Sequence, residues 1–460
     1  MLNPPRPEFL KFSPDQVSGS NFLMRRPSTM LADVPGLGKT SQCIHAFDCS
    51  GSSIGLVLCP PVLCVNWARE IAQWSFVGHK TTIIRKGTDT IPVDGIVICS
   101  YDIAIQPAVQ KALHSRGGDW LFLDEAHRLK NPTSERAKAV FKAKGIARNM
   151  KRVTWITGTP APNNASEFYT FLKSNGQFQG NRAAFISAFC ETRVEPAKLD
   201  EAMMSTMNEF RRRAYAKKMA LIQKTTIIGN KNIDQLKALL QPVYLRRTEI
   251  KGLPGLIENI VAIEGGAADL AAIEAATTPE IRAEIERAID AGNWQFFDTP
   301  HIATIRKLTG LAKAQAAGEM LVSELDDGEP AIIAFALHTA VIERIAQIVE
   351  KTDYRLAIID GSTSKKNRQA YIDAFQAGTI DVLLCQLDAA SEGITLTRSS
   401  RVIICEAAWT PAKNDQGIAR SLRRGQTSTV RATFLALYQS IDENVFATLR
   451  KKRRLLLEIV

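Results

Sequence analysis

The sequence predicts an α/β protein of two lobes, each built around a parallel β-sheet. The chain has 460 residues, too many for a single hydrophobic core, so two domains joined by a linker are expected. Short apolar runs alternate with helix-like segments in two separate stretches, one before residue 160 and one after residue 330. Strands that alternate with helices form parallel sheets with both faces covered.

The first stretch contains apolar runs that we expect to be buried strands, at 54–59, 96–99, 120–123 and 153–156. A loop with polar residues follows each run. Ligands of parallel sheets bind at the carboxyl ends of the strands, which is where Asp124 and Thr157 fall. The sequence therefore predicts a ligand site at this edge of the first sheet.

The second stretch repeats the pattern, with expected strands at 331–335, 355–359, 381–385 and 401–405. The two stretches resemble each other as the halves of a duplicated lobe would. The predicted domains, in chain order, are a first lobe, 1–255, with a basic helical protrusion near 162–240; a helical linker, 256–299; a second lobe, 300–445; and a basic C-terminal helix, 446–460.

The net charge of +11 favours a polyanionic partner, although a mildly basic enzyme without such a partner has a similar charge. The eight cysteines are scattered and form no C-x-x-C pair, which argues against a zinc site or a disulfide framework. No run approaches the roughly 18 apolar residues of a membrane span, and residues 1–12 do not resemble a signal peptide. We therefore expect a cytoplasmic protein without membrane contact.

A glycine-rich segment, Asp33 to Thr40, follows an apolar run and contains Gly36, Gly38 and Lys39. Glycines let backbone N–H groups turn toward phosphate oxygens, the lysine reaches the β- and γ-phosphates, and the threonine hydroxyl binds Mg²⁺. Asp33 stands where the general phosphate-loop pattern has glycine, so a glycine-rich turn before a helix is the alternative interpretation. The predicted ligands are ATP and Mg²⁺.

Two acidic residues, Asp124 and Glu125, end a fully apolar strand, where paired carboxylates contribute nothing to packing. Asp124 can hold Mg²⁺, directly or through water, while Glu125 can orient or deprotonate the attacking water. A surface turn after the strand is the alternative. The phosphate loop around Lys39 favours the catalytic interpretation.

Arg420 and Arg423 lie one helical turn apart, so one helix face can present both to a phosphate. Arginines delivered from a second lobe stabilise charge on the transferring phosphoryl group. Taken alone, the two residues also fit a solvated basic helix face. An ATP site with parts this far apart in sequence predicts two lobes that close on the nucleotide, as in a molecular motor.

These segments resemble those of the SNF2 family of superfamily 2 helicase-like ATPases, over nearly all of the chain. The Asp33–Thr40 segment is similar to the family's D-E-M-G-L-G-K-T, which accounts for Asp33. The most family-specific resemblance is Tyr244–Glu249 followed by Leu253 and Pro254, similar to L-R-R-T-K and a later L-P. The resemblance implies two RecA-like lobes with ATP bound between them.

The resemblance also implies roles for single residues. Gln16 matches the glutamine that reads adenine, and Gln416 belongs with Arg420 and Arg423 to the last catalytic motif. Coupling of hydrolysis to DNA is implied for His127, Thr157, Thr159 and Gly393. The candidate DNA contacts are Pro60, Asn66, Ser100, Tyr101, Ser362, the cluster Arg211, Arg212, Arg213, Lys217 and Lys218, and the tail Arg450–Arg454. For both basic clusters a solvated helix face is the alternative.

Within the family, Arg306–Lys313 and Ile359–Ser364 look most like the annealing-helicase, or fork-remodelling, branch. The implied function is a DNA-dependent ATPase that moves along duplex DNA and remodels branched DNA by branch migration, fork regression or strand annealing. The expected partners are duplex and branched DNA, together with single-stranded-DNA-binding or replication proteins. A monomer in a bacterial or phage-infected cell is expected.

Two alternatives stay open at this point. The same motor fits a restriction or defence complex, or the displacement of proteins such as RNA polymerase from DNA. A DNA-binding scaffold without catalysis belongs to a different class of protein. The intact set of Lys39, Asp124, Glu125, Arg420 and Arg423 argues against that scaffold.

Overall fold

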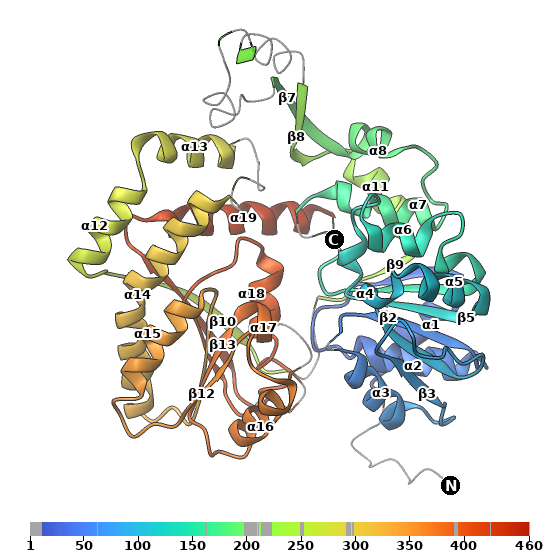
Figure 1. Cartoon of the computed structure of the whole chain (residues 1–460), viewed down its shortest axis with the longest axis horizontal. Helices are drawn as coiled ribbons and strands as arrows, with labels where there is room; N and C mark the ends of the chain where they lie inside the picture. The colour runs from blue at the N-terminus through green and yellow to red at the C-terminus, as the bar shows by residue number, and fades with distance from the viewer. Residues whose placement is uncertain are drawn as a thin grey trace.

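Two lobes lie side by side in the computed structural model, and the C-terminal helix crosses from one to the other (Figure 1). The structure describes residues 12–61, 63–161, 163–196, 209, 211–212, 223–248, 253–290, 296, 299–390, 394–423 and 425–459. Among the helices in these ranges, none is both long enough and apolar enough to cross a membrane.

Lobe 1, formed by the described residues from 12 to 248, is built on a parallel sheet with the strand order β3-β4-β2-β5-β6-β1-β9. Its strands are β1 (Ser28–Leu31), β2 (Gly55–Cys59), β3 (Thr81–Ile84), β4 (Ile96–Ser100), β5 (Gly118–Asp124), β6 (Met150–Ile156) and β9 (Tyr244–Leu245). The strands expected from apolar runs are β2, β4, β5 and β6, and that prediction is confirmed. The other three are too short to stand out in the sequence.

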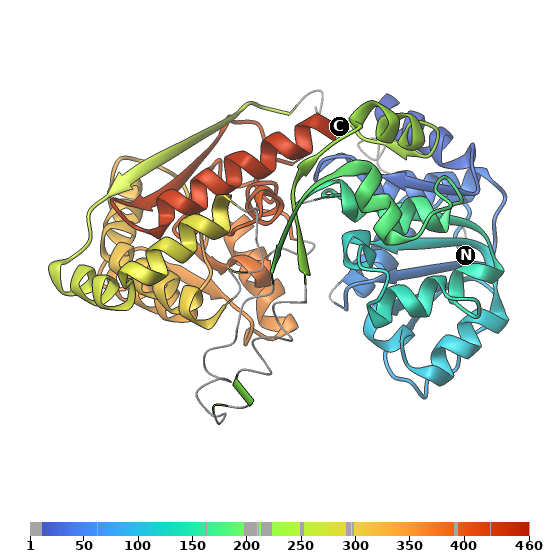
Figure 2. The same ribbon diagram turned by 90° about the horizontal axis from the view of Figure 1, so that it is seen from above.

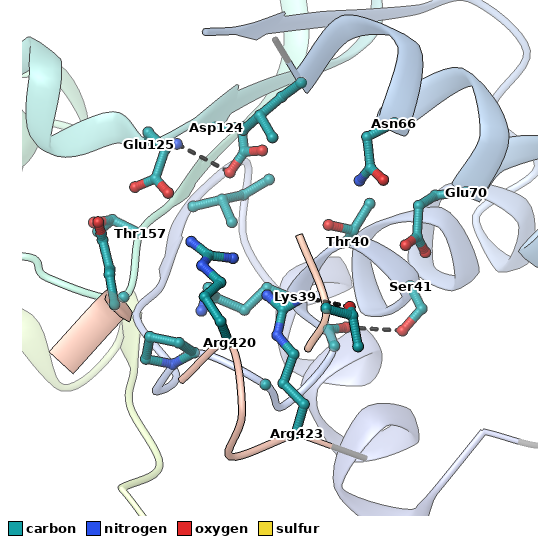
Figure 3. A pocket seen from close by; sticks show the side chains of 18 residues that line it. Lys39, Thr40, Ser41, Asn66, Glu70, Asp124, Glu125, Thr157, Arg420 and Arg423 are labelled. Carbon is teal, nitrogen blue, oxygen red and sulfur yellow. Dashed lines mark hydrogen bonds between the residues drawn. The ribbon is translucent and has the colours of Figure 1, made fainter. Parts of the chain in front are cut away.

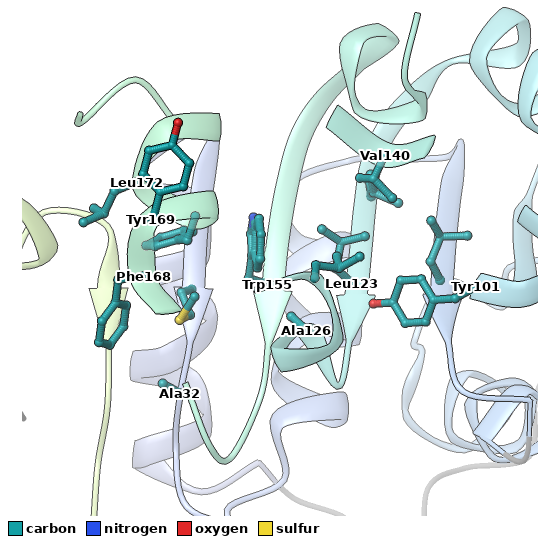
Figure 4. Packing of buried hydrophobic residues seen from close by; sticks show 14 of the residues in the cluster. Ala32, Tyr101, Leu123, Ala126, Val140, Trp155, Phe168, Tyr169 and Leu172 are labelled. Atoms are coloured by element: carbon teal, nitrogen blue, oxygen red, sulfur yellow. The ribbon is translucent and has the colours of Figure 1, made fainter. Parts of the chain in front are cut away.

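The two faces of this sheet are covered by different helices, because side chains alternate along each strand. Phe122 of β5 packs in the core on the side of α1 (Pro14–Met24), α2 (Lys39–Cys49) and α3 (Leu63–Trp74). Leu123, its neighbour, packs with Trp155 of β6 in the core on the opposite side (Figure 4). The helices of that side are α4 (Tyr101–Ala104), α5 (Pro107–Arg116), α6 (Glu135–Phe141), α7 (Tyr169–Ser174), α8 (Arg182–Phe189) and α11 (Ile233–Leu240).

Lobe 2, formed by the described residues from 253 to 440, has a second parallel sheet with the order β10-β15-β14-β11-β13-β12. Its strands are β10 (Leu256–Ile263), β11 (Ile332–Ala336), β12 (Leu356–Ile359), β13 (Val382–Gln386), β14 (Arg401–Ile404) and β15 (Val430–Leu437). The predicted strands β11 to β14 are confirmed. Both lobes are therefore α/β units with parallel sheets, as the sequence predicts.

Helices also cover both faces of the second sheet. The alternation along β11 sends Ile333 and Phe335 into one core and Ile332 and Ala334 into the other. The helices of lobe 2 are α12 (Ala267–Ala276), α13 (Pro279–Asp290), α14 (Pro300–Asp326), α15 (Thr339–Val349), α16 (Lys365–Gln376), α17 (Leu387–Ala390) and α18 (Pro411–Ile418).

Two of the predicted segments are not wholly helical. The protrusion expected near 162–240 contains an antiparallel pair, β7 (Cys190–Pro196) with β8 (Gln223–Asn230), beside its helices. The linker expected over 256–299 begins with β10, which pairs with β15 as the edge strand of the second sheet. Most of β10 is exposed, so its residues do not form the fully apolar run by which buried strands were identified.

The last helix, α19 (Ile441–Ile459), begins earlier than the predicted basic helix over 446–460 and joins the two lobes (Figures 1 and 2). It packs on β15 of lobe 2, while Ile459 is buried in a core of lobe 1. The side-chain amide of Asn230 donates to the carbonyl of Leu455 at 3.0 Å. The C-terminal helix is therefore a structural strap between the lobes.

Candidate active site

A cavity of about 310 Å³ opens where the two lobes face each other (Figure 3). Lobe 1 lines it with the loop before α2, the start of α3 and the ends of β5 and β6. Lobe 2 lines it with α18 and the turn that follows. The lining residues that carry polar or charged side chains are Lys39, Thr40, Ser41, Asn66, Glu70, Asp124, Glu125, Thr157, Thr395, Gln416, Arg420 and Arg423.

The loop before α2 has the backbone of a phosphate cradle. Gly36 and Gly38 take left-handed conformations with φ of 97° and 73°, which side chains on L residues disfavour. The ammonium of Lys39 donates to the carbonyls of Asp33 at 2.7 Å and Val34 at 3.3 Å. Burial lowers the pKa of Lys39, while Glu125, Asp33 and Asp124 favour its charged form.

Asp124 and Glu125 lie at the carboxyl end of β5 and face Lys39. The indole of Trp67 donates to Asp124 Oδ2 at 2.8 Å, and the backbone N–H of Glu125 donates to Asp124 Oδ1 at 2.9 Å. Burial and the charge of Glu125 raise the pKa of Asp124 to about 6. A cation in the cavity would favour the charged form of Asp124, whose ionisation burial and Glu125 oppose.

Glu125 itself has a strained backbone, with φ of 50° in the left-handed region. His127 Nδ1 lies 3.2 Å from Glu125 Oε2. Burial opposes ionisation of Glu125, but the hydrogen bond from His127 and the positive charges of His127, Lys39 and Arg420 hold its pKa below the usual range. The lowered pKa keeps Glu125 ionised, so its carboxylate can orient a water molecule.

The arginines of lobe 2 reach this charged group from the opposite wall. Arg423 donates from Nη1 to the carbonyl of Ile394 and to the hydroxyl of Thr395, each at 3.1 Å. Burial lowers the pKa of Arg423, and Glu70 of lobe 1 opposes that effect. The charges of Arg420 and Arg423 act on Glu125 and Lys39, so the two walls are within electrostatic reach of each other.

The donor set fits Mg²⁺ held jointly with phosphate oxygens. Thr40 and Asp124 offer oxygen ligands on one side of the cavity. Over the part of the chain that the structure describes, no group of three His, Cys, Asp or Glu side chains could hold a metal alone. Mg²⁺ is commonly bound by one or two carboxylates plus substrate phosphates, which matches this arrangement.

The structure brings most of the predicted ATP-site residues together, with one difference. Gln16 is buried and is not among the described residues that line the cavity. Its side-chain amide donates to Ser41 Oγ at 2.7 Å and accepts from the N–H of Ser13 at 2.9 Å. The predicted contact of Gln16 with adenine stays a prediction.

The predicted coupling residues lie together beside the cavity. His127 Nδ1 is 3.4 Å from the hydroxyl of Thr157, which accepts from the N–H of Thr159 at 3.0 Å. The loop after β5 and the loop after β6 are therefore in direct contact. Gly393 lies outside the described residues.

Several predicted DNA contacts are placed differently from expectation. Ser100 is buried and accepts from the N–H of Ile103 at the start of α4, and buried Tyr101 donates to the carbonyl of Asp124 at 2.9 Å. Pro60 is also buried, and Asn66 lines the cavity between the lobes. Ser100 and Tyr101 are therefore engaged within lobe 1, and contact of these four residues with DNA stays a prediction.

The other candidates divide into exposed and engaged residues. Ser362, Arg211 and Arg212 are exposed, whereas Arg213, Lys217 and Lys218 lie outside the described residues. In the tail, buried Lys452 donates to the carbonyl of Trp409 at 3.0 Å, and Arg453 pairs with Glu258 and Asp415. The strap helix therefore uses Lys452 and Arg453 in contacts within the protein, and contact of the tail with DNA stays a prediction.

Two residues of the site were missed by sequence reasoning. Glu70 lines the cavity, where burial raises its pKa, and Trp67 holds Asp124. Both lie on α3, and neither was among the candidate site residues predicted from the sequence. Their one-turn spacing on a helix that begins beside the cavity is the signal that could have found them.

The fold and this cavity define the class: a two-lobed ATPase with a phosphate loop in one lobe and arginines in the other. The SNF2-related domain matches residues 16–264, and the helicase conserved C-terminal domain matches residues 312–425. The chain belongs to the SNF2-related family, and it is an ATP-hydrolysing enzyme with two RecA-like lobes.

Curated relatives match along almost all of the chain. The SWI/SNF-related matrix-associated actin-dependent regulator of chromatin subfamily A-like protein 1 of Xenopus tropicalis is 27% identical over 450 residues, covering 96% of this chain and 44% of the relative. The DNA annealing helicase and endonuclease ZRANB3 of Mus musculus is 24% identical over 460 residues, covering 96% and 40%. The chain thus spans less than half the length of these relatives.

Among solved structures, the Sulfolobus solfataricus SWI2/SNF2 ATPase core in complex with dsDNA is similar at 22% identity. The match covers all of this chain and 95% of that one, with a TM-score of 0.44.

Proposed function

We propose that this protein is a DNA-stimulated ATPase that moves along duplex DNA and remodels branched DNA. The observation that carries the proposal is the composition of one cavity, where Lys39, Asp124 and Glu125 come from lobe 1 and Gln416, Arg420 and Arg423 come from lobe 2. A site divided between two lobes makes hydrolysis depend on how the lobes are oriented. Anything that aligns the lobes therefore controls the rate.

In this proposal each residue has a defined task. The backbone of the phosphate loop and Lys39 bind the triphosphate, and Thr40 and Asp124 hold Mg²⁺, which supplies charge neutralisation on the phosphate oxygens. Glu125 orients the attacking water and accepts its proton. Arg420 and Arg423 stabilise the charge on the transferring phosphoryl group when the lobes close.

Coupling to DNA follows from the contact between the loops after β5 and β6. His127 touches both Glu125 and Thr157, so a shift of the loop at Thr157 changes the surroundings of the proposed base. A phosphate backbone that spans both lobes would fix their orientation without reading sequence, which suits a motor that tracks along DNA. We expect weak ATP hydrolysis alone and strong stimulation by DNA.

ATP hydrolysis measured with single strand, plain duplex, fork and four-way junction tests this directly. The wild-type protein should hydrolyse ATP at least tenfold faster with the preferred DNA than alone, by analogy with other site-completing arginines, whose effect is about 10³ or more. Equal rates with and without DNA would show that the lobes are already aligned and would remove the coupling from the proposal.

The remodelling of branched DNA has a different basis. Relatives are named annealing helicase and endonuclease, and the segment Arg306–Lys313 looks like that branch of the family. In the structure this segment is internal support: Arg306 lies over the Trp409 ring, 5.0 Å from its centroid, and Lys313 pairs with Asp442. The resemblance therefore concerns the build of lobe 2 and not a direct contact with DNA.

Energetics favour junctions over plain duplex for a motor of this kind. Branch migration exchanges base pairs one for one, so its net cost per step is near zero, while unwinding costs roughly 1.4 kcal/mol of stacking per base-pair step. We expect ATP-dependent migration of a mobile four-way junction, or regression of a fork, with little strand displacement from a tailed duplex. Efficient displacement from the tailed duplex with junctions untouched would make the protein a conventional helicase.

A further inference from the structure

Two unusual residues of the sequence meet in the structure. Asp33 replaces the first glycine of the general phosphate-loop pattern, and Arg247 belongs to the family-specific segment far along the chain. Arg247 Nε donates to Asp33 Oδ1 at 3.0 Å, and Nη2 donates to Asp33 Oδ2. The backbone N–H of Arg247 also donates to Asp33 Oδ1 at 3.0 Å. The side chain of Asp33 is fully buried, and the guanidinium of Arg247, bound through two of its nitrogens, is its counterion.

The same guanidinium extends to two helices that border the phosphate loop. Arg247 Nη2 donates to Gln42 Oε1 of α2 at 2.7 Å, and Nη1 donates to the carbonyl of Asp15 in α1. Gln42 closes the group, because its amide donates to Asp33 Oδ2 at 3.1 Å and to the carbonyl of Leu37 at 3.2 Å. One arginine thus connects β9, the phosphate loop, α1 and α2.

The packing around this group leaves no spare room. A Cβ on Gly19 of α1 would lie 1.8 Å from Gln42 Oε1 and 2.8 Å from Arg247 Nη2, so α1 approaches the network as closely as a backbone can. Ser20, the next residue, donates to the carbonyls of Gln16 and Gln42 at 2.8 and 2.9 Å. The position of α1 relative to the phosphate loop is therefore set by contacts with Gln42 and Arg247.

The network also reaches the groups that would meet the nucleotide. The carbonyl of Asp33 accepts from the ammonium of Lys39 at 2.7 Å, and the N–H of Val34 donates to the carbonyl of Arg247 at 3.0 Å. On the other side, Asp15 is followed directly by Gln16, which donates to Ser41 of the phosphate-loop helix. Arg247 thus holds both the start of the phosphate loop and the helix that carries the proposed base-reading residue.

We propose that Arg247 is a positioning residue that sets the distance between α1 and the phosphate loop and thereby the preference for adenine over guanine nucleotides. This inference rests on the proposed function and on the prediction that Gln16 contacts adenine, so that Gln16 and Lys39 bind the two ends of ATP. The fork of an arginine is required because three acceptors on different elements must be held at once, and a lysine ammonium cannot match their planar arrangement. Asp33 is fully buried and Arg247 partly buried, so each charge needs the other as its counterion.

The key variant is Arg247→Lys, which keeps the charge opposite Asp33 but not the fork. We expect its affinity for ATP to fall about tenfold, the loss expected for a charge-assisted hydrogen bond that no longer holds its acceptor. Affinity for GTP should change much less, so the ATP-to-GTP preference falls. Binding is measured with fluorescent ATP and GTP analogues in the absence of DNA, and thermal unfolding is measured alongside.

The matched control is Arg344→Gln, which removes a two-pronged pair with Asp269 in lobe 2, with both distances 3.1 Å. It should lower the unfolding temperature without changing the nucleotide preference. Arg247→Gln should lower the preference further, and Asp33→Asn combined with it should restore stability but not the preference, because two amides relieve the unpaired charge without rebuilding the fork.

The proposal is overturned if Arg247→Lys keeps the ATP-to-GTP preference of the wild type, whether both affinities are unchanged or fall by the same factor. Failure of Arg247→Lys to fold would also overturn it, since the pair would then be a folding element alone. The proposed function has its own, separate readout: a wild-type protein whose ATP hydrolysis ignores DNA contradicts that function, whatever Arg247 does.

Discussion

The two lobes have the same architecture but treat the carboxylates at their sheet edges in opposite ways. Asp124 ends β5 in lobe 1, and Glu406 follows β14 in lobe 2. Asp124 is partly exposed and Glu406 is buried, and both face the loops at the carboxyl ends of parallel strands. Their surroundings differ in how many donors neutralise the charge.

Donors of lobe 2 satisfy the carboxylate of Glu406. It accepts from the N–H groups of Leu337 and His338 at 2.8 and 2.9 Å and from the imidazole of His338 at 2.7 Å. Burial opposes its ionisation, but the hydrogen bonds and charge of His338 hold its pKa below the usual range. Its partners are all within lobe 2, so this carboxylate stabilises the lobe and needs no ligand.

Each carboxylate oxygen of Asp124 has one donor, Trp67 or the N–H of Glu125, but its charge lies beside another carboxylate. Burial and the like charge of Glu125 raise the pKa of Asp124, and Glu125 has a strained backbone. A raised pKa and backbone strain at one place are typical of functional sites. A parallel sheet alone therefore does not make a nucleotide site. In lobe 1 the strained backbone and the paired carboxylates lie at the cavity, whereas in lobe 2 the corresponding carboxylate is satisfied within the lobe.

The largest effect should come from Glu125→Gln. This change keeps the shape of the side chain but removes the proposed base, so turnover should fall on the order of 10⁴, the upper range for general-base catalysis. ATP binding should persist, because the phosphate loop is untouched. Steady-state hydrolysis and fluorescent-nucleotide binding measure the two properties. Turnover close to the wild type would remove Glu125 from the proposed mechanism.

Arg423→Ala should have the next largest effect, on the order of 10³ in turnover, as for other arginines that complete a phosphoryl-transfer site. ATP affinity should change little, because the triphosphate is held by lobe 1. Single-turnover hydrolysis with DNA present separates the chemical step from binding. A variant that loses ATP affinity but not the chemical rate would show that Arg423 binds substrate instead.

The sequence predicted this difference between the lobes only in part. Lys39, Asp124 and Arg420 could be found because their chemistry requires particular residue types at particular positions relative to strands and helices. The predicted strands could be found because they are runs of apolar residues. Two strands of lobe 2 were missed because polar residues interrupt them: Glu258 and Asn259 in the exposed edge strand β10, and Arg431 and Thr433 in buried β15.

The missed parts depend on tertiary contacts that no local pattern encodes. Trp67 of α3 donates to Asp124, and Tyr101, for which the resemblance implies a DNA contact, donates to the carbonyl of the same residue. Lys452 and Arg453 look like a solvent-facing basic run, but α19 turns them toward Trp409, Glu258 and Asp415. A run of charged residues in a sequence predicts polar surroundings, but it does not show whether the partner is DNA or another part of the protein.

The variant Glu406→Gln tests whether the buried carboxylate of lobe 2 serves stability and not catalysis. The glutamine amide has a single acceptor oxygen, so at least one of the three donors loses its partner. The free energy of unfolding should fall by about 1–3 kcal/mol, while the folded protein should keep its ATP hydrolysis. Because the pKa of Glu406 is lowered in the folded state, its contribution is present above the unfolded pKa and is lost as pH falls through the folded pKa.

Denaturant unfolding across the acid range measures this effect. The variant should show a flatter loss of stability below the ordinary glutamate pKa of about 4.3 than the wild type. Equal acid sensitivity in the two proteins would show that other carboxylates of lobe 2 dominate, and loss of ATP hydrolysis by the folded variant would show that Glu406 belongs to the site.

The smallest effect concerns the two basic clusters, which differ as the lobes do. Arg211 and Arg212 are exposed on the lobe 1 protrusion, and half-exposed Arg453 on the strap helix pairs with Glu258 and Asp415. If the exposed pair meets DNA phosphates, Arg211→Gln with Arg212→Gln should reduce the slope of log binding constant against log salt by about 2, near 0.9 per phosphate contact. Arg453→Gln should leave that slope unchanged and lower the unfolding temperature instead, because it breaks ion pairs with Glu258 and Asp415.

Fluorescence-anisotropy titrations of duplex at several salt concentrations measure the slopes. An unaltered slope in the double variant would identify Arg211 and Arg212 as a solvated helix face, and a reduced slope in Arg453→Gln would return the strap helix to the DNA surface.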